Sequence, residues 1–196
     1  MFLRLAIQCE SAGLEGIIAQ DTLIKIPTII KNYVRHLTSQ YPNSGRLSPL
    51  DSNIGPAIVY VFSSLALPDS FLPGPCDRTA NRISGQDEWS KAVEMIKRAV
   101  SYAAADDSIG GDEVLYGRAG LLWAMLNLKT WLDSRDGRLS VERQDLDNIM
   151  GDNRLEVIFD EIIKAGDTSA ELYKKASGES MMPLMWPWHG KYYLGA

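Results

Sequence analysis

Residues 113–126 read EVLYGRAGLLWAML, and this stretch does more than any other to set the expected fold. Two glycines, Gly117 and Gly120, are followed by an apolar run that keeps a helical period as far as Trp131. The segment 114–131 is apolar around most of its circumference, which is typical of a helix that is buried on most sides. We therefore expect a buried helix here, entered through a turn whose glycines let neighbouring buried helices pass closely.

The rest of the chain also has helical periodicity. In residues 26–37 the apolar positions recur at i, i+3, i+4 and i+7. No alternating apolar and polar run is long enough to predict a strand, so the predicted class is all-α. The further expected elements are helices at 54–67, 88–105, 154–165 (Leu155, Ile158, Phe159, Ile162 and Ile163 facing inward) and 169–176, a loop at 68–86, a turn at 106–112 and a charged linker at 133–152.

The order of these helices suggests a repeat. An amphipathic helix, a glycine-containing turn and a very apolar helix occur twice, and the two turn glycines are Gly55 and Gly117. In the first repeat the second glycine is replaced by Ile58, which weakens close packing there. Such a rhythm predicts an α/α toroid (a six-hairpin-like barrel), with about half of the ring present in this chain. An irregular helical bundle is the alternative.

Composition and charge narrow the class of protein. The chain of 196 residues is 45% hydrophobic and carries a net charge of -5, with basic residues scattered along it. No basic stripe offers a footprint for nucleic acid. Its two cysteines, Cys9 and Cys76, have no metal-binding spacing and are interpreted as reduced thiols. Since no segment has the length of a membrane span, we expect a cytoplasmic protein without a transmembrane helix.

Two segments carry a resemblance to a known family. The LYGRAG pattern within residues 113–126 resembles the turn of eukaryotic lanthionine synthetase C-like (LanC-like) proteins. Residues 183–196, PLMWPWHGKYYLGA, are similar to the family stretch P-L-M-x-x-W-H-G-K-x-Y-x-G-A of plant and fungal members, which includes Gly195 as a structural glycine. The resemblance implies that residues 1–196 are the N-terminal part of a single LanC-like domain, with residues 1–45 less clearly matched.

The resemblance also implies a chemistry. In the family, zinc held by two cysteines and a histidine activates a thiol, such as that of glutathione, for addition to dehydroamino acids in peptides and proteins. The family motifs that supply the zinc ligands (W-C-x-G and C-H-G) and the catalytic histidine (A-H-G) find no match among Cys9, Cys76, His36 and His189. We therefore expect no metal ligand in this chain, zinc ligands C-terminal to Ala196, and no activity of the chain by itself.

Four residues are candidates for a site. Glu113 matches an acidic position that implies a role as general acid or base, although it can equally act as a charge at a helix N-terminus. The resemblance makes Arg118, His189 and Lys191 candidates for binding an anionic thiol substrate. For Arg118 the alternative is pairing with a helix C-terminus, and for His189 a structural turn.

Three hypotheses for function therefore stand beside each other. The first is a LanC-like thiol-addition enzyme, and the second is a non-catalytic glutathione-binding or interaction module. The third, a glycosidase-like enzyme, rests on the toroid alone, and no persuasive carboxylate pair supports it. A half toroid would expose an apolar face, so self-association is expected. The resemblance also implies a peripheral association with the plasma membrane, which no lipidation motif in the sequence supports.

Overall fold

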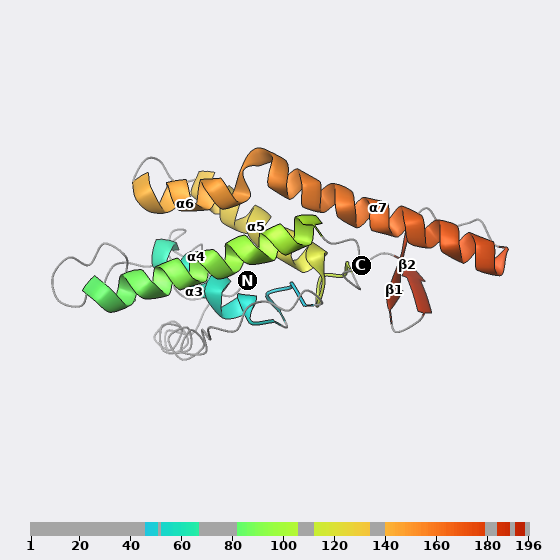
Figure 1. Cartoon of the computed structure of the whole chain (residues 1–196), viewed down its shortest axis with the longest axis horizontal. Coiled ribbons are helices and arrows are strands. Elements are labelled where there is room, and N and C mark those ends of the chain that lie inside the picture. Colours follow the sequence, from blue (N-terminus) through green and yellow to red (C-terminus); the bar gives the residue numbers. More distant parts are fainter. Residues whose placement is uncertain are drawn as a thin grey trace, which may run out of the picture.

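The computed structural model describes residues 46–50, 52–66, 82–105, 112–133, 140–178, 184–188 and 191–194 (Figure 1). The described part is mostly helical, as the sequence predicts, and ends in a short antiparallel hairpin. The elements are α3 (Ile54–Ala66), α4 (Arg82–Ala105), α5 (Arg118–Asp133), α6 (Ser140–Met150), α7 (Asp152–Ser177), β1 (Met185–Trp188) and β2 (Lys191–Leu194). The predicted helix at 26–37, His36, Cys9 and Cys76 lie outside the described residues.

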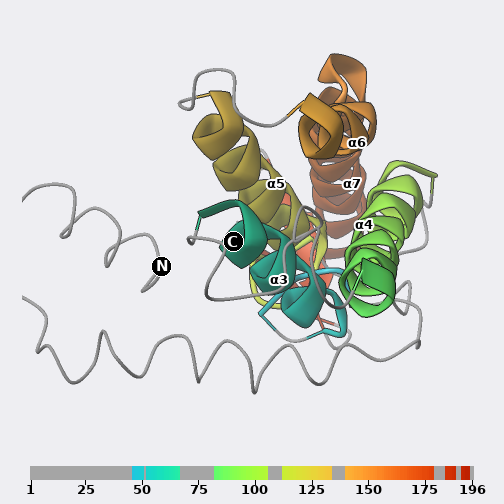
Figure 2. The same ribbon diagram turned by 90° about the vertical axis from the view of Figure 1, so that its left-hand side faces the viewer.

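The helices pack around α4, which contacts each of α3, α5, α6 and α7. Viewed along the bundle, α4 and α5 lie on opposite sides, α3 lies below them, and α6 and α7 lie above (Figure 2). The two apolar helices of the proposed repeat, α3 and α5, therefore meet mainly through α4 and the loop that precedes α3. The toroid remains a prediction from the sequence.

One apolar core joins the helices. Each helix contributes side chains that recur at helical spacing and point to the same interior, which is how amphipathic helices bury their apolar surface. The fully buried members with the largest side chains include Leu47, Tyr60, Ile96, Leu121, Met125, Leu128, Leu146 and Ile158. Burial raises the pKa of the Tyr60 hydroxyl, and the nearby negative charge of Glu88 adds to the rise.

The predicted helix at 54–67 is confirmed as α3. Its start is fixed by Ser52, whose hydroxyl accepts a hydrogen bond from the backbone N–H of Ile54 at 3.2 Å. Gly55 and Pro56 follow in the first turn and are buried. A proline fits here because the first turn of a helix does not need its N–H for an internal hydrogen bond.

The charged linker predicted at 133–152 is wrong, because α6 lies within it. Leu146, Ile149 and Met150 are buried and lie on one face, at i, i+3 and i+4. Exposed polar residues, Asp147 and Asn148, separate these apolar positions, so the short stripe was not recognised in the sequence. A three-residue stripe is enough for a helix when α4 and α7 are present to receive it.

The two helices predicted at 154–165 and 169–176 are one helix, α7. Gly166 falls between the two predicted helices and lies on the buried side of the single helix. The helix ends at Gly178, whose φ of 76° is left-handed and whose N–H donates to the Lys174 carbonyl. Leu155, Ile158 and Ile162 are buried as predicted, whereas Phe159 is 52% exposed, so its predicted inward orientation is wrong.

The hairpin is an element that the sequence did not predict. Strands β1 and β2 pair antiparallel, with Met185 opposite Leu194 and Trp188 opposite Lys191. Met185 is buried, and β1 packs against α7 (Figure 1). Proline and tryptophan in this stretch obscured the alternation on which strand prediction depends. None of the described helices combines the length and the apolar character that crossing a membrane requires.

The packing of α6 can be tested by shortening one side chain. Leu146→Ala is expected to lower the free energy of unfolding by about 2–5 kcal/mol, because Leu146 is fully buried and its loss leaves a cavity. Asp145→Ala, an exposed neighbour, is the control and should change it by less than about 0.5 kcal/mol. Urea unfolding followed by circular dichroism measures both, and equal stability of the two variants would mean that this region is a solvated linker.

Candidate functional site

The turn that precedes α5 brings together most of the residues that the sequence singled out. The N–H of Gly117 donates to the carbonyl of Glu113 at 2.9 Å, which closes the turn immediately before Arg118 begins the helix. Gly117 is buried, and its φ lies outside the left-handed region. The turn therefore does not depend on a left-handed backbone angle at this position.

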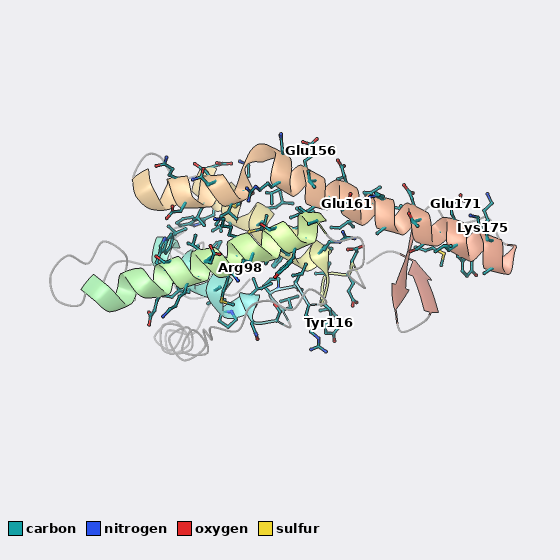
Figure 3. The ribbon with its side chains drawn as sticks, in the orientation of Figure 1. Arg98, Tyr116, Glu156, Glu161, Glu171 and Lys175 are labelled. Carbon is teal, nitrogen blue, oxygen red and sulfur yellow. The ribbon has the colours of Figure 1, made fainter. Side chains whose placement is uncertain are left out.

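A second chain segment is fastened to this turn. Leu47 and Ser48 donate their backbone N–H groups to the Tyr116 carbonyl at 2.9 and 3.2 Å, and the Ser48 hydroxyl donates to the Val114 carbonyl at 2.6 Å. These three hydrogen bonds are called the loop–turn link below. Ser48 is completely buried, so the link satisfies polar groups that have little access to water. Figure 3 labels Tyr116 at this turn.

Gly120 is required by the same link. A Cβ atom at this position would overlap the Val114 carbonyl oxygen and the Ser48 hydroxyl, and would lie 2.7 Å from the Ser48 Cβ. Gly120 thus permits a close approach of the backbone. The segment that approaches is the loop before α3, together with the preceding turn, and not a neighbouring apolar helix.

Asp112 and Arg118 form a buried ion pair across the turn. The Arg118 Nη2 donates to Asp112 Oδ2 at 2.9 Å, and Nε donates to Oδ1, so the pair is bidentate. The side chains are 1% and 2% exposed. Nη2 also lies 3.4 Å from the carbonyl oxygen of Glu161, a residue of α7 that Figure 3 labels. One guanidinium therefore connects the turn, α5 and α7.

The electrostatics of the pair combine opposing effects. Burial raises the pKa of the Asp112 carboxyl above its ordinary value, and the hydrogen bond and charge of Arg118 oppose that rise. Arg118 is the first residue of α5, where the positive end of the helix dipole disfavours a cation. Asp112 offsets this cost, because its carboxylate supplies the counter-charge directly beside the helix start.

Glu113 and Tyr116 lie on the more open side of the turn. Both side chains are partly exposed. The guanidinium carbon of Arg46 lies 5.9 Å from the centre of the Tyr116 ring, within the range of a cation–π contact. Glu113 therefore follows a buried carboxylate in the sequence, and its own side chain is only partly exposed, with the Oε1 atom buried. A partly desolvated carboxylate on a fixed backbone is a suitable group for proton transfer.

The other predicted site residues lie in other elements or outside the described residues. Gly55 is in the first turn of α3. Lys191 begins β2, and only its backbone is described. His189 and Gly195 lie outside the described residues. The structure thus brings Glu113, Gly117, Arg118 and Gly120 to one turn, while the predicted contacts of His189 and Lys191 with a substrate stay predictions.

Asp112 is the residue of this region whose role sequence reasoning missed. It was interpreted only as part of an acidic run near a helix start. The signal was nevertheless present, because Arg118 opens a helix that is otherwise apolar as far as Asn127. A cation in such a position needs a buried partner, and the two acidic residues just before the turn, Asp112 and Glu113, are the nearest choices.

A zinc site does not fit the described residues. In the ranges that the structure describes, no three histidine, cysteine, aspartate or glutamate side chains are grouped so that they could hold a metal ion. Comparison with known proteins adds no family: no family model matches the chain, and no solved structure matches it. The resemblance drawn from the sequence therefore rests on residues 113–126 and 183–196.

The ion pair can be tested by removing one partner. Asp112→Ala is expected to lower the free energy of unfolding by about 3–5 kcal/mol, because it leaves the Arg118 guanidinium buried without a counter-charge. Asp112→Leu combined with Arg118→Met should lose less, since no charge is then left in the core. The exposed pair of Glu94 and Arg98 is the control, and Glu94→Ala should cost less than about 0.5 kcal/mol in the same denaturation assay.

Gly120 offers a test of the loop–turn link. Alanine normally stabilises a helix by about 1 kcal/mol relative to glycine. Gly120→Ala should instead destabilise the protein by roughly 1–3 kcal/mol, because the new methyl group overlaps backbone and Ser48 atoms. Thr130→Ala, at an exposed position of the same helix, should be neutral or slightly stabilising. A higher melting temperature for Gly120→Ala would contradict the close approach.

Proposed function

We propose that this chain is the N-terminal part of a LanC-like protein, whose family activity is the addition of a thiol, that of glutathione in particular, to dehydroamino acids in peptides and proteins. The support is the similarity of residues 113–126 and 183–196 to the two family stretches. The observation that carries the proposal is Glu113, which lies on a turn made rigid by the Asp112–Arg118 pair and the loop–turn link.

The arrangement of the helices in an α/α toroid is part of the same proposal. The helices α3 and α5 would be inner helices of an α/α toroid, and α4 an outer helix between them. The order of elements supports this, since a glycine marks the start of each apolar helix: Gly55 lies in the first turn of α3, and Gly117 lies in the turn before α5. In such a toroid the loops at one end of the inner helices surround the site. Glu113 precedes an inner helix and would therefore lie at that end.

The proposed chemistry gives Glu113 one proton to move. The thiolate sulfur adds to the β-carbon of the dehydroamino acid, and the electrons of the carbon–carbon π bond move towards the adjacent carbonyl. Glu113, as a carboxylic acid, donates a proton to the α-carbon, and it recovers a proton from the next thiol. In sum, the S–H bond and the carbon–carbon π bond are broken, one C–S bond and one C–H bond form, and no oxidant is needed.

The proposal gives Arg118 a structural role, whereas it gives His189 and Lys191 a role in binding substrate. Because Arg118 is 1% exposed and engaged with Asp112, the proposal assigns it to holding the turn. An anionic substrate such as glutathione would then meet Lys191 and His189. In the family the metal activates the thiol, and the proposal gives the described residues no part in binding it.

The decisive experiment starts from the gene. The codons after Ala196 should encode Ala-His-Gly and then the two cysteine motifs of the family. The extended protein, supplied with zinc and glutathione, should convert a dehydroalanine peptide into its glutathione adduct, which mass spectrometry detects. Glu113→Gln should slow this by about 10²–10⁴-fold because it removes the proton donor while keeping the shape. Glu156→Gln, on the exposed side of α7 (Figure 3), is the matched control.

Three results would separate the proposal from its competitors. Unrelated codons or a stop after Ala196, with glutathione binding retained, would favour the non-catalytic binding module. Full activity of Glu113→Gln would remove the proposed proton donor, although not the family. Stoichiometric zinc in the purified 196-residue chain would overturn the placement of every metal ligand beyond Ala196.

A further inference from the structure

One side of α5 carries large apolar side chains that no described element covers. Trp123 is 48% exposed and Leu126 is 47% exposed, although the sequence predicted burial around most of this helix. The two residues are three positions apart and therefore lie on the same face. This pair is called the α5 apolar face below. Met125 and Leu128, on the other side, are fully buried in the core.

The apolar exposure continues at the turn where α5 begins. Val114 and Leu115 are 38% and 53% exposed, and Leu50 is 57% exposed. Leu50 belongs to the loop before α3, where its N–H donates to the Ser48 hydroxyl that in turn bonds to Val114. Isolated exposed apolar residues are ordinary on a protein surface, but five of them along α5, its preceding turn and the loop before α3 suggest an occupant.

The chain itself arrives at this place. The described residues begin at Arg46, and Leu47 and Ser48 are bonded to Tyr116 at the start of α5. The 45 residues that precede Arg46 are thus attached beside the exposed side chains. Trp123 lies five residues into α5, which is about 8 Å along the helix axis from Arg118.

The preceding sequence contains a segment with a matching apolar face. In residues 26–37 the apolar positions form a single stripe, with Ile26, Ile30 and Val34 among them, and the polar positions are mostly basic or neutral. The eight residues from 38 to 45 can span up to roughly 26 Å when extended. This tether is long enough to lay the stripe along the first turns of α5.

We propose that residues 26–37 dock their apolar stripe on the α5 apolar face of the same molecule. The tether keeps the segment at an effective concentration of about a millimolar, well above that of a second molecule in a dilute solution. Intramolecular coverage is therefore favoured over the self-association expected from the sequence. This proposal does not depend on the proposed thiol-addition function.

Chemical cross-linking of the full chain tests the proposal. Cys9 and Cys76 are first replaced by serine, and cysteines are then introduced as Ile30→Cys and Leu126→Cys. A short bis-maleimide at micromolar protein should give a product of monomer mass whose linked peptides contain positions 30 and 126. The control pair is Ile30→Cys with Glu171→Cys, since Glu171 is exposed near the far end of α7 (Figure 3).

The yields decide between the possible occupants. Docking should make the intramolecular product form about ten times faster, or more, for the pair 30 and 126 than for the control pair. Equal rates for both pairs would mean that the segment has no fixed place, and the proposal would fail. A product of dimer mass through position 126 would show that a second copy covers the face instead.

A second measurement guards against damage by the new cysteines. In the otherwise native chain, Trp123→Ser should lower the unfolding midpoint, and so should Val34→Asp. If the two residues meet, the double variant should lose clearly less than the sum of the single losses. Additive losses, or no loss in either single variant, would contradict docking.

Discussion

The structure around α5 depends on the buried ion pair of Asp112 and Arg118. A guanidinium at the first residue of an apolar helix is unfavourable unless a carboxylate reaches it, and Asp112 does so with two hydrogen bonds. The same guanidinium lies close to a backbone carbonyl of α7. This single group therefore sets the direction in which the chain enters α5 and the position of α5 against α7. The exposed side of the turn, with Glu113, is held in place as a consequence.

Close backbone packing is the second constraint, and it acts on the same turn. Ser48 can bond to the Val114 carbonyl only because Gly120 leaves room for it. Two interactions thus fix the turn. The ion pair holds it by charge, and the loop–turn link holds it by hydrogen bonds that fit only because Gly120 has no side chain. A candidate acid on such a turn loses little freedom when a substrate binds, because its backbone is already fixed.

The sequence predicted the helical class, because helical periodicity is a local signal. It placed a close approach at the glycines of the turn but assigned it to neighbouring helices, whereas the loop before α3 is what approaches Gly120. It predicted the buried face of α7 well except for Phe159, and it missed α6, whose stripe of Leu146, Ile149 and Met150 gains its energy from α4 and α7 rather than from its own pattern. The partner of Arg118 was missed for a similar reason. Which charges meet in a core is decided by tertiary packing, and the sequence shows only that a partner is needed.

The loop–turn link also bears on how the protein folds. Ser48 and Val114 are 66 residues apart in the chain, so their hydrogen bond closes a long loop that contains all of α3 and α4. Closing such a loop is entropically costly before the helices between the two ends have packed. The turn before α5 therefore acquires its final geometry late, after the α3–α4 pair has formed. The part of the chain that the proposed chemistry needs most is then among the last to be completed.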